Sequence, residues 1–298
     1  MTVPTPRRPG GPVQVAGKII AVRRVGAYQH LTILAPGVAE TARPGQFVAL
    51  AVGGERTGML LRRSFSIHKV SPTGVYGGTV DVVVADAGRG THWLTTRDVG
   101  EPVDVVGPLG RAFPLPKTPQ SCVLVGGGYG TAPLFWLADV LRERGCRVDI
   151  VLGAASQDRL FGVLEARRSA TTSTVTTDDG SAGTKGRVTD VLGEVIDRAD
   201  AAVVYACGPM AMLRAVTDVA ALHGAVAQVA VEESMACGVG ICMTCVMPVE
   251  GSDGVTRMLR SCVEGPVFRG DTVRWETWQD GIGRVPDDCV GAAAMRSH

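Results

Sequence analysis

The sequence contains no apolar run long enough to cross a membrane, no surplus of either charge and no hydrophobic stretch near its first residue. Its 30 Lys and Arg residues nearly balance 29 Asp and Glu residues, and no basic stripe offers a surface to nucleic-acid phosphates. Residues 1–12 contain Pro and Arg but lack the apolar core of a secretory signal. These absences argue against a membrane, nucleic-acid or secretory role and predict a cytoplasmic protein.

What remains has the composition of a globular enzyme. Hydrophobic residues make up 45% of the chain and charged residues 20%, both ordinary values. A length of 298 residues predicts about two to three domains. The 39 glycines exceed the usual share, and many stand in short clusters beside expected strands, where ligand-binding turns occur.

Four of the eight cysteines form the most specific motif of the chain. Cys237, Cys242 and Cys245 are spaced C-x4-C-x2-C, and Cys262 follows after sixteen further residues. This is the ligand pattern of plant-type 2Fe–2S clusters. Two glycines inside the first interval allow positive φ angles, which bring backbone amides close to the sulfurs, where they help to set the reduction potential.

Disulfides and zinc are the alternatives for these cysteines. An intracellular chain keeps its thiols reduced, so clustered cysteines there favour metal binding over disulfides. Structural zinc sites prefer paired C-x2-4-C knuckles, whereas here one cysteine stands opposite three, so the spacing favours the cluster and leaves zinc as the competing hypothesis. Cys122 and Cys146 are expected to be small buried side chains, and Cys289 a free thiol.

The first third of the chain predicts an antiparallel β-barrel. Short strands separated by Gly and Pro turn signals are expected at 13–15, 19–22, 30–34, 47–52, 65–70, 80–85 and 102–106. Closely spaced strands of this kind are typical of a sandwich or barrel. The sequence predicts at most one short helix within this region, at 91–96.

Two stretches of this barrel are candidates for binding an anion. Arg62 and Arg63 precede a strand with an aromatic ring and a hydroxyl, and arginine binds phosphate groups through two parallel hydrogen bonds. Gly88, Gly90 and Thr91 offer backbone amides and a hydroxyl where a short helix begins. Taken alone, adjacent arginines are usually solvated and a Gly-x-Gly is usually a turn, so each stretch is weak evidence.

A Gly-rich turn marks a second, α/β region after a Pro-rich linker at 114–119. Residues 122–125 form a continuous apolar strand, the turn reads G-x-G-x-x-P from Gly128 to Pro133, and a helix is expected at 133–144. Strand, turn and helix N-terminus together predict a dinucleotide pyrophosphate site. Further strands are expected at 147–152, 173–177 and 201–206, and further helices at 160–168, 189–197 and 210–223. This alternation predicts a doubly wound sheet.

The strand expected at 201–206 runs into Cys207, Gly208 and Pro209. Ligands of doubly wound sheets lie at the carboxyl ends of the strands, so a nicotinamide could reach this turn. Cys207 is therefore a candidate cofactor contact, and a small buried side chain is the plainer interpretation that stays open beside it.

In chain order these motifs resemble the landmarks of the ferredoxin–NADP reductase superfamily. Arg63-x-Phe65-Ser66 is similar to its flavin signature, and the Gly88, Gly128 and Cys207 motifs are similar to its other landmarks. With the cysteine motif following the nucleotide region, the layout from residue 13 to about 270 resembles the electron-transfer subunits of two-subunit, NAD-linked dihydroorotate dehydrogenases. Residues 177–181 and the run around the first cysteines are similar to those of that family.

The resemblance implies a multi-domain β plus α/β protein with FAD, NAD(H) and a 2Fe–2S cluster as cofactors. It implies a loose N-terminus at 1–12, an FAD-binding barrel at 13–114, a doubly wound NAD-binding domain at 118–228, a cluster domain at 229–280 and a tail at 281–298. The implied cofactor-binding residues are Arg63, Ser64, Phe65, Ser66, Val83, Val84, Ala85, Gly88, Gly90, Thr91, Gly126, Gly128, Gly130, Thr131, Pro133, Cys207, Gly208 and Pro209.

Some positions depart from the family. It often has Pro where Ser64 stands and Arg where Ser234 stands, and Phe65 lacks the hydroxyl of the tyrosine found in many members. NADP-using relatives tend to place an Arg or Lys in the turn at 153–156, and Ala155 supplies no such charge, which favours NAD. Arg159 keeps NADP open as an alternative.

The resemblance also implies an oxidoreductase subunit that relays electrons and has no dihydroorotate site of its own. A nicotinamide exchanges two electrons as a hydride and a cluster only one, so FAD must stand between them. An FMN-containing partner subunit, in a heterotetramer, would oxidise dihydroorotate for pyrimidine synthesis. The alternatives are a related reductase for another partner, such as a sulfide dehydrogenase, hydrogenase or ferredoxin:NADP oxidoreductase complex, a reductase for a diffusing acceptor, and a zinc-binding regulator.

Overall fold

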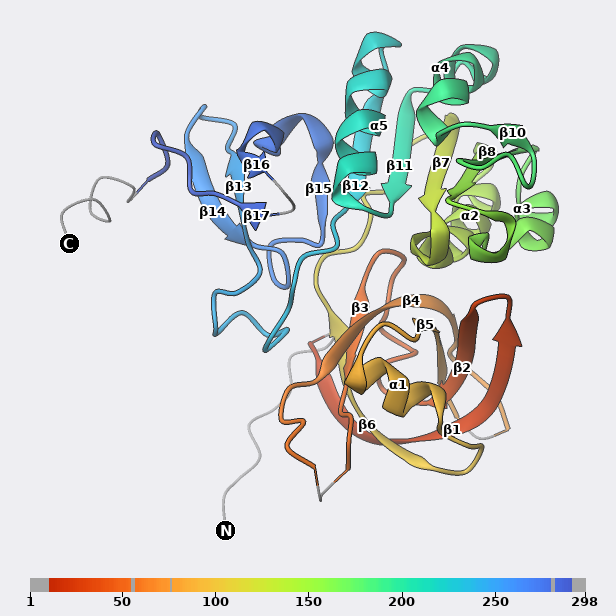
Figure 1. Cartoon of the computed structure of the whole chain (residues 1–298), viewed down its shortest axis with the longest axis vertical. Coiled ribbons are helices and arrows are strands. Elements are labelled where there is room, and N and C mark those ends of the chain that lie inside the picture. Colours follow the sequence, from red (N-terminus) through yellow and green to blue (C-terminus); the bar gives the residue numbers. More distant parts are fainter. Residues whose placement is uncertain (1–10, 55–56, 76, 280–281, 291–298) are drawn as a thin grey trace.

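The computed structural model describes residues 11–54, 57–75, 77–279 and 282–290. A barrel, an α/β sheet and a small C-terminal part surround a common junction (Figure 1). Residues 1–10 and 291–298 of the expected loose termini lie outside the described residues. Within the described ranges, no helix is long and apolar enough to cross a membrane.

The N-terminal part is a closed antiparallel barrel of six strands in the order β1-β2-β5-β4-β3-β6. Its elements are β1 (Val13–Val25), β2 (Tyr28–Leu34), β3 (Phe47–Leu50), β4 (Arg63–Ser71), β5 (Thr79–Ala85), the short helix α1 (Arg89–Thr95) and β6 (Pro102–Leu109). Alternating apolar side chains such as Leu31, Ile33, Val80 and Val82 fill its interior. The predicted barrel is confirmed.

The two strands expected at 13–15 and 19–22 are one continuous strand, β1. Its first half pairs with β6 and its second half with β2, and the register shifts between Ile19 and Ala21. Gly17 lies where the backbone passes close to both neighbours, because an added Cβ would stand 2.8 Å from the Leu34 carbonyl oxygen and 3.0 Å from that of Val103. The missing side chain of Gly17 therefore permits this close approach of three strands within the barrel.

The second part is a seven-stranded sheet in the order β10-β9-β8-β7-β11-β12-β15. Its strands are β7 (Ser121–Gly127), β8 (Arg147–Ala154), β9 (Thr172–Thr177), β10 (Thr184–Lys185), β11 (Val203–Cys207), β12 (Val226–Ala230) and β15 (Val267–Arg269). Its helices are α2 (Ala132–Glu143), α3 (Val163–Ser169), α4 (Val188–Ala199) and α5 (Met210–Leu222), with 3-10 turns η1 (Gly128–Thr131) and η2 (Gln157–Arg159). All strand pairs are parallel except β12 with β15.

Helices cover both faces of this sheet, as a doubly wound fold requires. Along β7, Val123 and Val125 face a core formed with α4 and α5, whereas Cys122 and Leu124 face a core formed with α2. Cys122 and Cys146 are buried in the second core, which agrees with their expected role as small apolar side chains. The expected helices and strands of this region are confirmed, with boundaries shifted by a few residues.

The C-terminal part is not separate from this sheet. The expected boundary at residue 228 falls within β12, and β15 returns from the expected cluster segment to pair with β12. Between them lie the cysteine loop and a hairpin of β13 (Val246–Glu250) and β14 (Thr256–Arg260), seen at the upper left of Figure 1. Part of the expected tail, residues 282–290, packs against this hairpin. There the Val290 amide donates to the Thr256 carbonyl at 3.1 Å, and Cys289 is buried as a free thiol.

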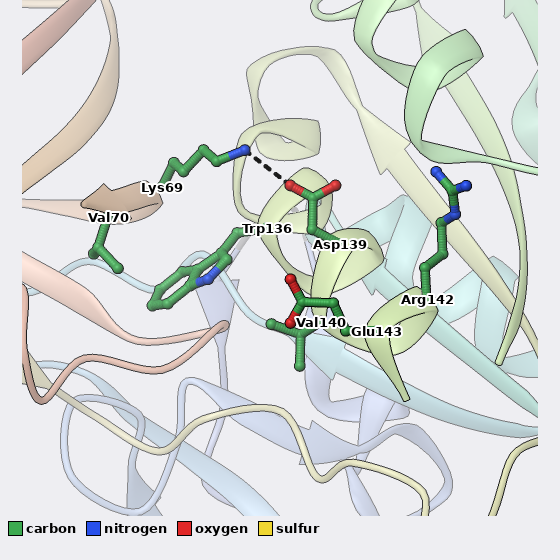
Figure 2. Close-up of a pocket in the computed structure, with 7 residues that line it drawn as sticks. All are labelled: Lys69, Val70, Trp136, Asp139, Val140, Arg142 and Glu143. Carbon is green, nitrogen blue, oxygen red and sulfur yellow. Dashed lines mark hydrogen bonds and ion pairs between the residues drawn. The ribbon is translucent and has the colours of Figure 1, made fainter. Parts of the chain in front are cut away.

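The barrel and the sheet share one apolar core at their junction. Tyr28 and Val83 of the barrel pack in the same cluster as Phe135 of α2 and Phe161. On the outer side, Lys69 of β4 reaches Asp139 of α2 at 2.8 Å across a surface hollow (Figure 2). Both side chains are partly exposed, so this ion pair adds little stability and the shared core fixes the two parts.

His68 of β4 is the buried polar group of this junction. Its Nδ1–H donates to the Ala132 carbonyl at the start of α2 at 2.7 Å, and its ring meets those of His30, Phe135 and Phe161 edge-on. Burial, partly offset by the charge of Glu165, lowers the pKa of His68. The folded protein therefore holds a neutral imidazole here.

We expect the free energy of unfolding of His68→Asn to decrease less in acid than that of the wild-type protein. A depressed folded pKa gives stability that is complete above the unfolded pKa, about 6.5, and is lost as pH falls below it. Asn keeps a donor for the Ala132 carbonyl without a titrating ring. Urea unfolding at pH 7.5 and 5.0 should show the variant losing about 1 kcal/mol less than wild type. His92→Asn, at an exposed site, is the matched control, and equal slopes for all three proteins would contradict this expectation.

Candidate cofactor pocket and cysteine cluster

A pocket of about 390 Å³ opens between the barrel, the turn after β7 and the segment after β12. Nine of the predicted cofactor-binding residues line it: Arg63, Ser64, Phe65, Ser66, Val83, Ala85, Thr91, Gly130 and Pro133. The remaining lining residues are Phe47, Ala87, Tyr129, Ala132, Val231, Glu232, Glu233, Ser234, Met235 and Pro266. Both stretches singled out in the barrel therefore meet the Gly-rich turn at one site.

The two adjacent arginines have different roles. Arg62 forms an ion pair with Asp104 of β6 at 2.7 Å and also donates to the Asp104 carbonyl at 3.1 Å. Arg63 lines the pocket, and its Nη1 donates to the carbonyls of Leu61 at 2.7 Å and Arg62 at 3.3 Å. Arg62 thus ties the start of β4 to β6, and Arg63 is the guanidinium that lines the pocket.

The Gly88–Thr91 loop closes on Arg63. The Thr91 hydroxyl accepts from the amides of Ala87 and Gly88 at 3.0 and 2.9 Å and donates to the Gly88 carbonyl, which fixes the loop as α1 begins. Gly90 packs directly on Arg63, since an added Cβ would stand 2.7 Å from its Nε. Around Gly88 an added Cβ would meet open space. Of the two glycines in this motif, only Gly90 is required by packing.

Val84 is the predicted barrel residue whose side chain faces away from the pocket. It is fully buried in the barrel core with Ile67 and Leu94, as strand alternation dictates for a residue between Val83 and Ala85. Only its backbone remains available to a ligand, and Val83 and Ala85 present their side chains on the pocket side.

The remaining predicted residues lie in the Gly-rich turn after β7 and in the turn after β11. Gly126 is the second-last residue of β7, Gly128 adopts a positive φ of 56°, and the Thr131 hydroxyl donates to the Gly128 carbonyl at 2.8 Å. This turn lies against the end of β11, since an added Cβ on Gly130 would stand 2.8 Å from Gly208 Cα. The Gly-x-Gly motif and the Cys207-Gly208-Pro209 motif are thus adjacent at the carboxyl edge of the sheet.

Sequence reasoning missed an acidic group in the pocket, Glu232 and Glu233. They follow Val231, the residue after the last parallel strand β12, and two acids near a strand's carboxyl end are the signal that could have identified them. Burial raises the pKa of Glu232. The charge of Glu232, followed by burial, raises the pKa of Tyr129 to about 12, and burial followed by Glu232 raises that of Cys207 far above its usual value. This end of the pocket therefore disfavours additional negative charge.

A second acidic group lies beside the turn after β8. The amides of Asp178 and Asp179 donate to the carbonyls of Ala154 and Ala155 at 3.1 and 3.3 Å. Ser181 completes the contact by accepting from the Gln157 amide at 2.7 Å. This is the turn in which the sequence lacked a cation for a 2′-phosphate, and the structure adds two exposed carboxylates beside it.

The four predicted ligand cysteines come together as two pairs. Cys245 precedes β13 and Cys262 follows β14, so the open end of the hairpin brings them together, and both pack in one small apolar cluster with Phe47. Cys237 and Cys242 lie together in the preceding loop, where the Cys242 amide donates to Cys237 Sγ at 3.5 Å. Among the described residues, no three Cys, His, Asp or Glu side chains converge on a single metal position. Two pairs suit the two irons of a 2Fe–2S cluster, each with two thiolate ligands, better than one tetrahedral zinc.

Backbone amides of the loop prepare Cys237 to bind as a thiolate. Although partial burial opposes it, amides of residues 239, 241 and 242 lower the pKa of Cys237 to about 6. The amides of Ile241 and Cys242 lie 3.3 and 3.5 Å from its sulfur. Burial, followed by the neighbouring Cys245, raises the pKa of Cys262 to about 12, so bound metal must displace its proton.

The pocket and the cysteines share side chains. Phe47 and Met235 line the pocket and also pack with Cys245 and Cys262 in a small apolar cluster. An added Cβ on Gly238 would stand 3.6 Å from Ser64 Oγ, so the cysteine loop lies on the flavin signature itself. A cofactor in the pocket and a cluster on the cysteines would be separated by a single layer of side chains.

Two family models match parts of the chain. The family model described as iron-sulfur cluster binding domain of dihydroorotate dehydrogenase B matches residues 232–274, which contain all four cysteines. The model described as oxidoreductase NAD-binding domain matches residues 124–218.

Individual proteins match over most of their length. The chain is 41% identical to a Geobacillus thermodenitrificans protein and 36% identical to a Desulforamulus reducens protein, both named dihydroorotate dehydrogenase B (NAD(+)), electron transfer subunit. These matches cover 82% and 87% of this chain, and 91% and 97% of the relatives. A solved chain from an NADH-dependent reduced ferredoxin-NADP oxidoreductase superposes with a TM-score of 0.76 at 32% identity, covering 88% of this chain and 91% of that one.

The two glycines of the loop before Thr91, Gly88 and Gly90, provide a test of the pocket. We expect Gly90→Ala to weaken FAD binding by about tenfold or more, because it displaces Arg63 and one charge-assisted hydrogen bond contributes about 1.5–3 kcal/mol. Gly88→Ala is the matched control, since its backbone is extended and its Cβ meets open space. The measurement is flavin fluorescence during titration of the apoprotein. Equal FAD affinity of the two variants would show that Gly90 does not position Arg63.

Proposed function

Because the chain belongs to the family of electron transfer subunits of NAD-dependent dihydroorotate dehydrogenase B, we propose that it works beside a dihydroorotate-oxidising partner. It carries the electrons from that oxidation to NAD+ through FAD and a 2Fe–2S cluster of its own, and so serves pyrimidine synthesis. The observation that best supports this route is the sharing of Phe47 and Met235 by the pocket and the cysteine pairs.

When bound, FAD supplies the exchange between a two-electron hydride and single electrons. The chain itself binds and orients. Arg63 is assigned to the pyrophosphate, Phe65 and Ser66 to the flavin ring, and Val83 to Ala85 to backbone contacts with it, because these side chains or strands line the pocket. Gly90 and Thr91 close the phosphate end.

The turn from Gly126 to Pro133 is assigned to the NAD(H) pyrophosphate. It presents backbone amides at the start of a helix, where the unpaired N–H groups and the helix dipole favour an anion. Cys207, Gly208 and Pro209 border the nicotinamide end, since Gly130 packs against Gly208. Burial keeps the Cys207 thiol protonated there, as its strongly raised pKa requires.

The carboxylates beside the turn after β8 support NAD over NADP. A 2′-phosphate placed there would meet Asp178 and Asp179 without a compensating cation from the turn, and like charges repel by about 1 kcal/mol or more at short range. A ribose 2′-hydroxyl carries no such penalty and has carboxylate acceptors beside it.

We expect Asp178→Asn to narrow the preference for NADH. Removing one carboxylate should raise kcat/KM with NADPH by roughly fivefold, for about 1 kcal/mol of repulsion, and leave that with NADH little changed. Asp200→Asn is the control, because it removes the same charge at the opposite edge of the sheet and its left-handed φ of 49° suits Asn. Steady-state reduction of ferricyanide provides the rates. A wild-type protein that prefers NADPH would overturn the NAD assignment.

The partner is proposed to carry FMN and to form a heterotetramer with this chain. Support comes from the loop around the first cysteine pair, where Ile241 and Met243 are exposed apolar side chains beside an exposed Cys242. Such residues at a redox centre suit a protein surface that is covered in a complex. A cytoplasmic location is proposed too, because all eight cysteines are free thiols and those that bind iron must stay reduced.

The second candidate is a related reductase serving another partner. The 32% identity and TM-score of 0.76 with a chain of a reduced ferredoxin-NADP oxidoreductase favour it specifically. Co-purification separates the two. A dihydroorotate-oxidising, FMN-containing chain in the complex supports the first function, and a different flavoprotein partner supports the second.

Loss of the cluster should distinguish electron transfer between NAD(H) and FAD from electron transfer between FAD and the partner subunit. We expect Cys262→Ser to keep the wild-type rate of NADH-dependent ferricyanide reduction, which needs only the FAD side, and to lose dihydroorotate-dependent reduction of NAD+ in the reconstituted complex. Cys289→Ser, a buried thiol outside the motif, should retain both activities. Visible absorption reports the cluster directly.

Two results would contradict this function. A wild-type chain without flavin and 2Fe–2S absorption bleached by NADH would refute the whole relay. Full dihydroorotate-dependent activity in a Cys262→Ser protein that lacks cluster absorption would show that electrons bypass the cluster.

A further inference from the structure

Arg260 connects the two halves of the cysteine motif. It stands at the end of β14, two residues before Cys262, and its Nη1 donates to the Gly240 carbonyl in the loop between Cys237 and Cys242 at 2.9 Å. Gly240 has a positive φ of 84°, and an added Cβ there would collide with Val263. The loop is therefore seated against the turn that carries Cys262.

The peptide group that Arg260 holds is also the one that contacts a ligand sulfur. The carbonyl of Gly240 and the N–H of Ile241 belong to the same planar peptide unit. While that carbonyl accepts from Arg260, the Ile241 N–H donates to Cys237 Sγ at 3.3 Å. Fixing one end of the peptide fixes the direction of the other, and a cation on the carbonyl polarises the N–H toward the sulfur.

Glu264 holds the guanidinium in place. Its carboxylate accepts from Arg260 Nε at 3.1 Å, from Nη2 at 2.6 Å and from the Arg260 backbone amide at 2.8 Å. This fork geometry is specific to arginine and leaves Nη1 pointing at Gly240. The guanidinium therefore contacts, through one peptide group, the amide that donates to a ligand sulfur.

We propose that Arg260 is a positioning residue of the 2Fe–2S site: it holds the Gly240–Ile241 peptide so that its N–H faces the Cys237 sulfur, and Glu264 balances its charge. Replacing a residue that orients a metal ligand in this way commonly weakens metal binding about 10- to 100-fold. Hydrogen bonds to the sulfurs and local charge also set the reduction potential. The proposal rests on the assignment of a cluster to these cysteines and adds what holds and tunes it.

Variants can test separately the charge of Arg260 and its hydrogen bonds to Glu264 and Gly240. Arg260→Gln removes the cation and leaves Glu264 negative beside the cluster, so the midpoint potential should fall. Glu264→Gln leaves Arg260 unneutralised, so the potential should rise. Arg260→Lys keeps the charge but lacks the fork that reaches Glu264 and Gly240 together, so the potential should fall less than in Arg260→Gln while the loop loosens.

The experiment uses the full chain with both cofactors. A redox titration followed by electron paramagnetic resonance gives the midpoint potential, and bleaching in the presence of an iron chelator gives the rate of cluster loss. Both Arg260 variants should lose the cluster about tenfold faster than wild type. Arg257→Gln is the matched control, since it removes the same charge from the same strand, where Arg257 pairs with Asp253 at 2.7 Å outside the cysteine loop.

Three outcomes overturn the proposal. Wild-type potential and loss rate in both Arg260 variants would show that the Gly240 contact has no role. A shift in Arg257→Gln as large as that in Arg260→Gln would reduce the effect to general surface charge. A wild-type chain that shows no cluster absorption would instead refute the cluster assignment itself, and the positioning role with it. Bound FAD and the melting temperature verify that each variant is folded.

Discussion

The pairing of β15 with β12 determines where the cofactors can lie. The chain leaves the sheet at Val231, forms the cysteine loop and the β13–β14 hairpin, and returns to the sheet at Pro266. The Pro266 carbonyl accepts from the Val231 amide at 3.0 Å. Both residues line the pocket. The Arg111 amide donates to the neighbouring Gly265 carbonyl at 2.6 Å, which joins the end of the barrel to the same point. One short stretch of backbone therefore fixes barrel, sheet and cysteine loop relative to one another.

Local patterns predicted the parts of this arrangement but not its joints. The βα alternation, the Gly-x-Gly turn and the cysteine spacing each depend on neighbouring residues, so they could be read from the sequence, and the structure has the expected elements. The return of β15 to the sheet depends on a partner strand about forty residues earlier and has no local signal. The same holds for Arg62 and Arg63, whose different roles depend on Asp104 in another strand. The two strands expected at 13–15 and 19–22 are one strand because the pairing of β1 with both β6 and β2 is set by distant residues.

The two ends of the relay have opposite electrostatics. In the pocket, burial and Glu232 raise the pKa of Tyr129 and Cys207, which keeps both groups neutral beside a bound coenzyme. In the cysteine loop, backbone amides lower the pKa of Cys237 to about 6 although the loop offers no free cation of its own. The pocket thus keeps Tyr129 and Cys207 protonated, whereas iron needs thiolates. The chain achieves the first through Glu232 and burial, and the second through amides held by positive-φ glycines.

The cysteine pairs also differ in exposure, and this gives the relay a direction in space. Cys245 and Cys262 are buried against Phe47 and Met235, which line the pocket. Cys242 is exposed, with Ile241 and Met243 beside it. An iron held by the buried pair would stand on the flavin side, and an iron held by Cys237 and Cys242 on the outer side. Since electron transfer weakens steeply with distance, a partner that covers the exposed loop would shorten the path for electrons more than one docked elsewhere on the chain.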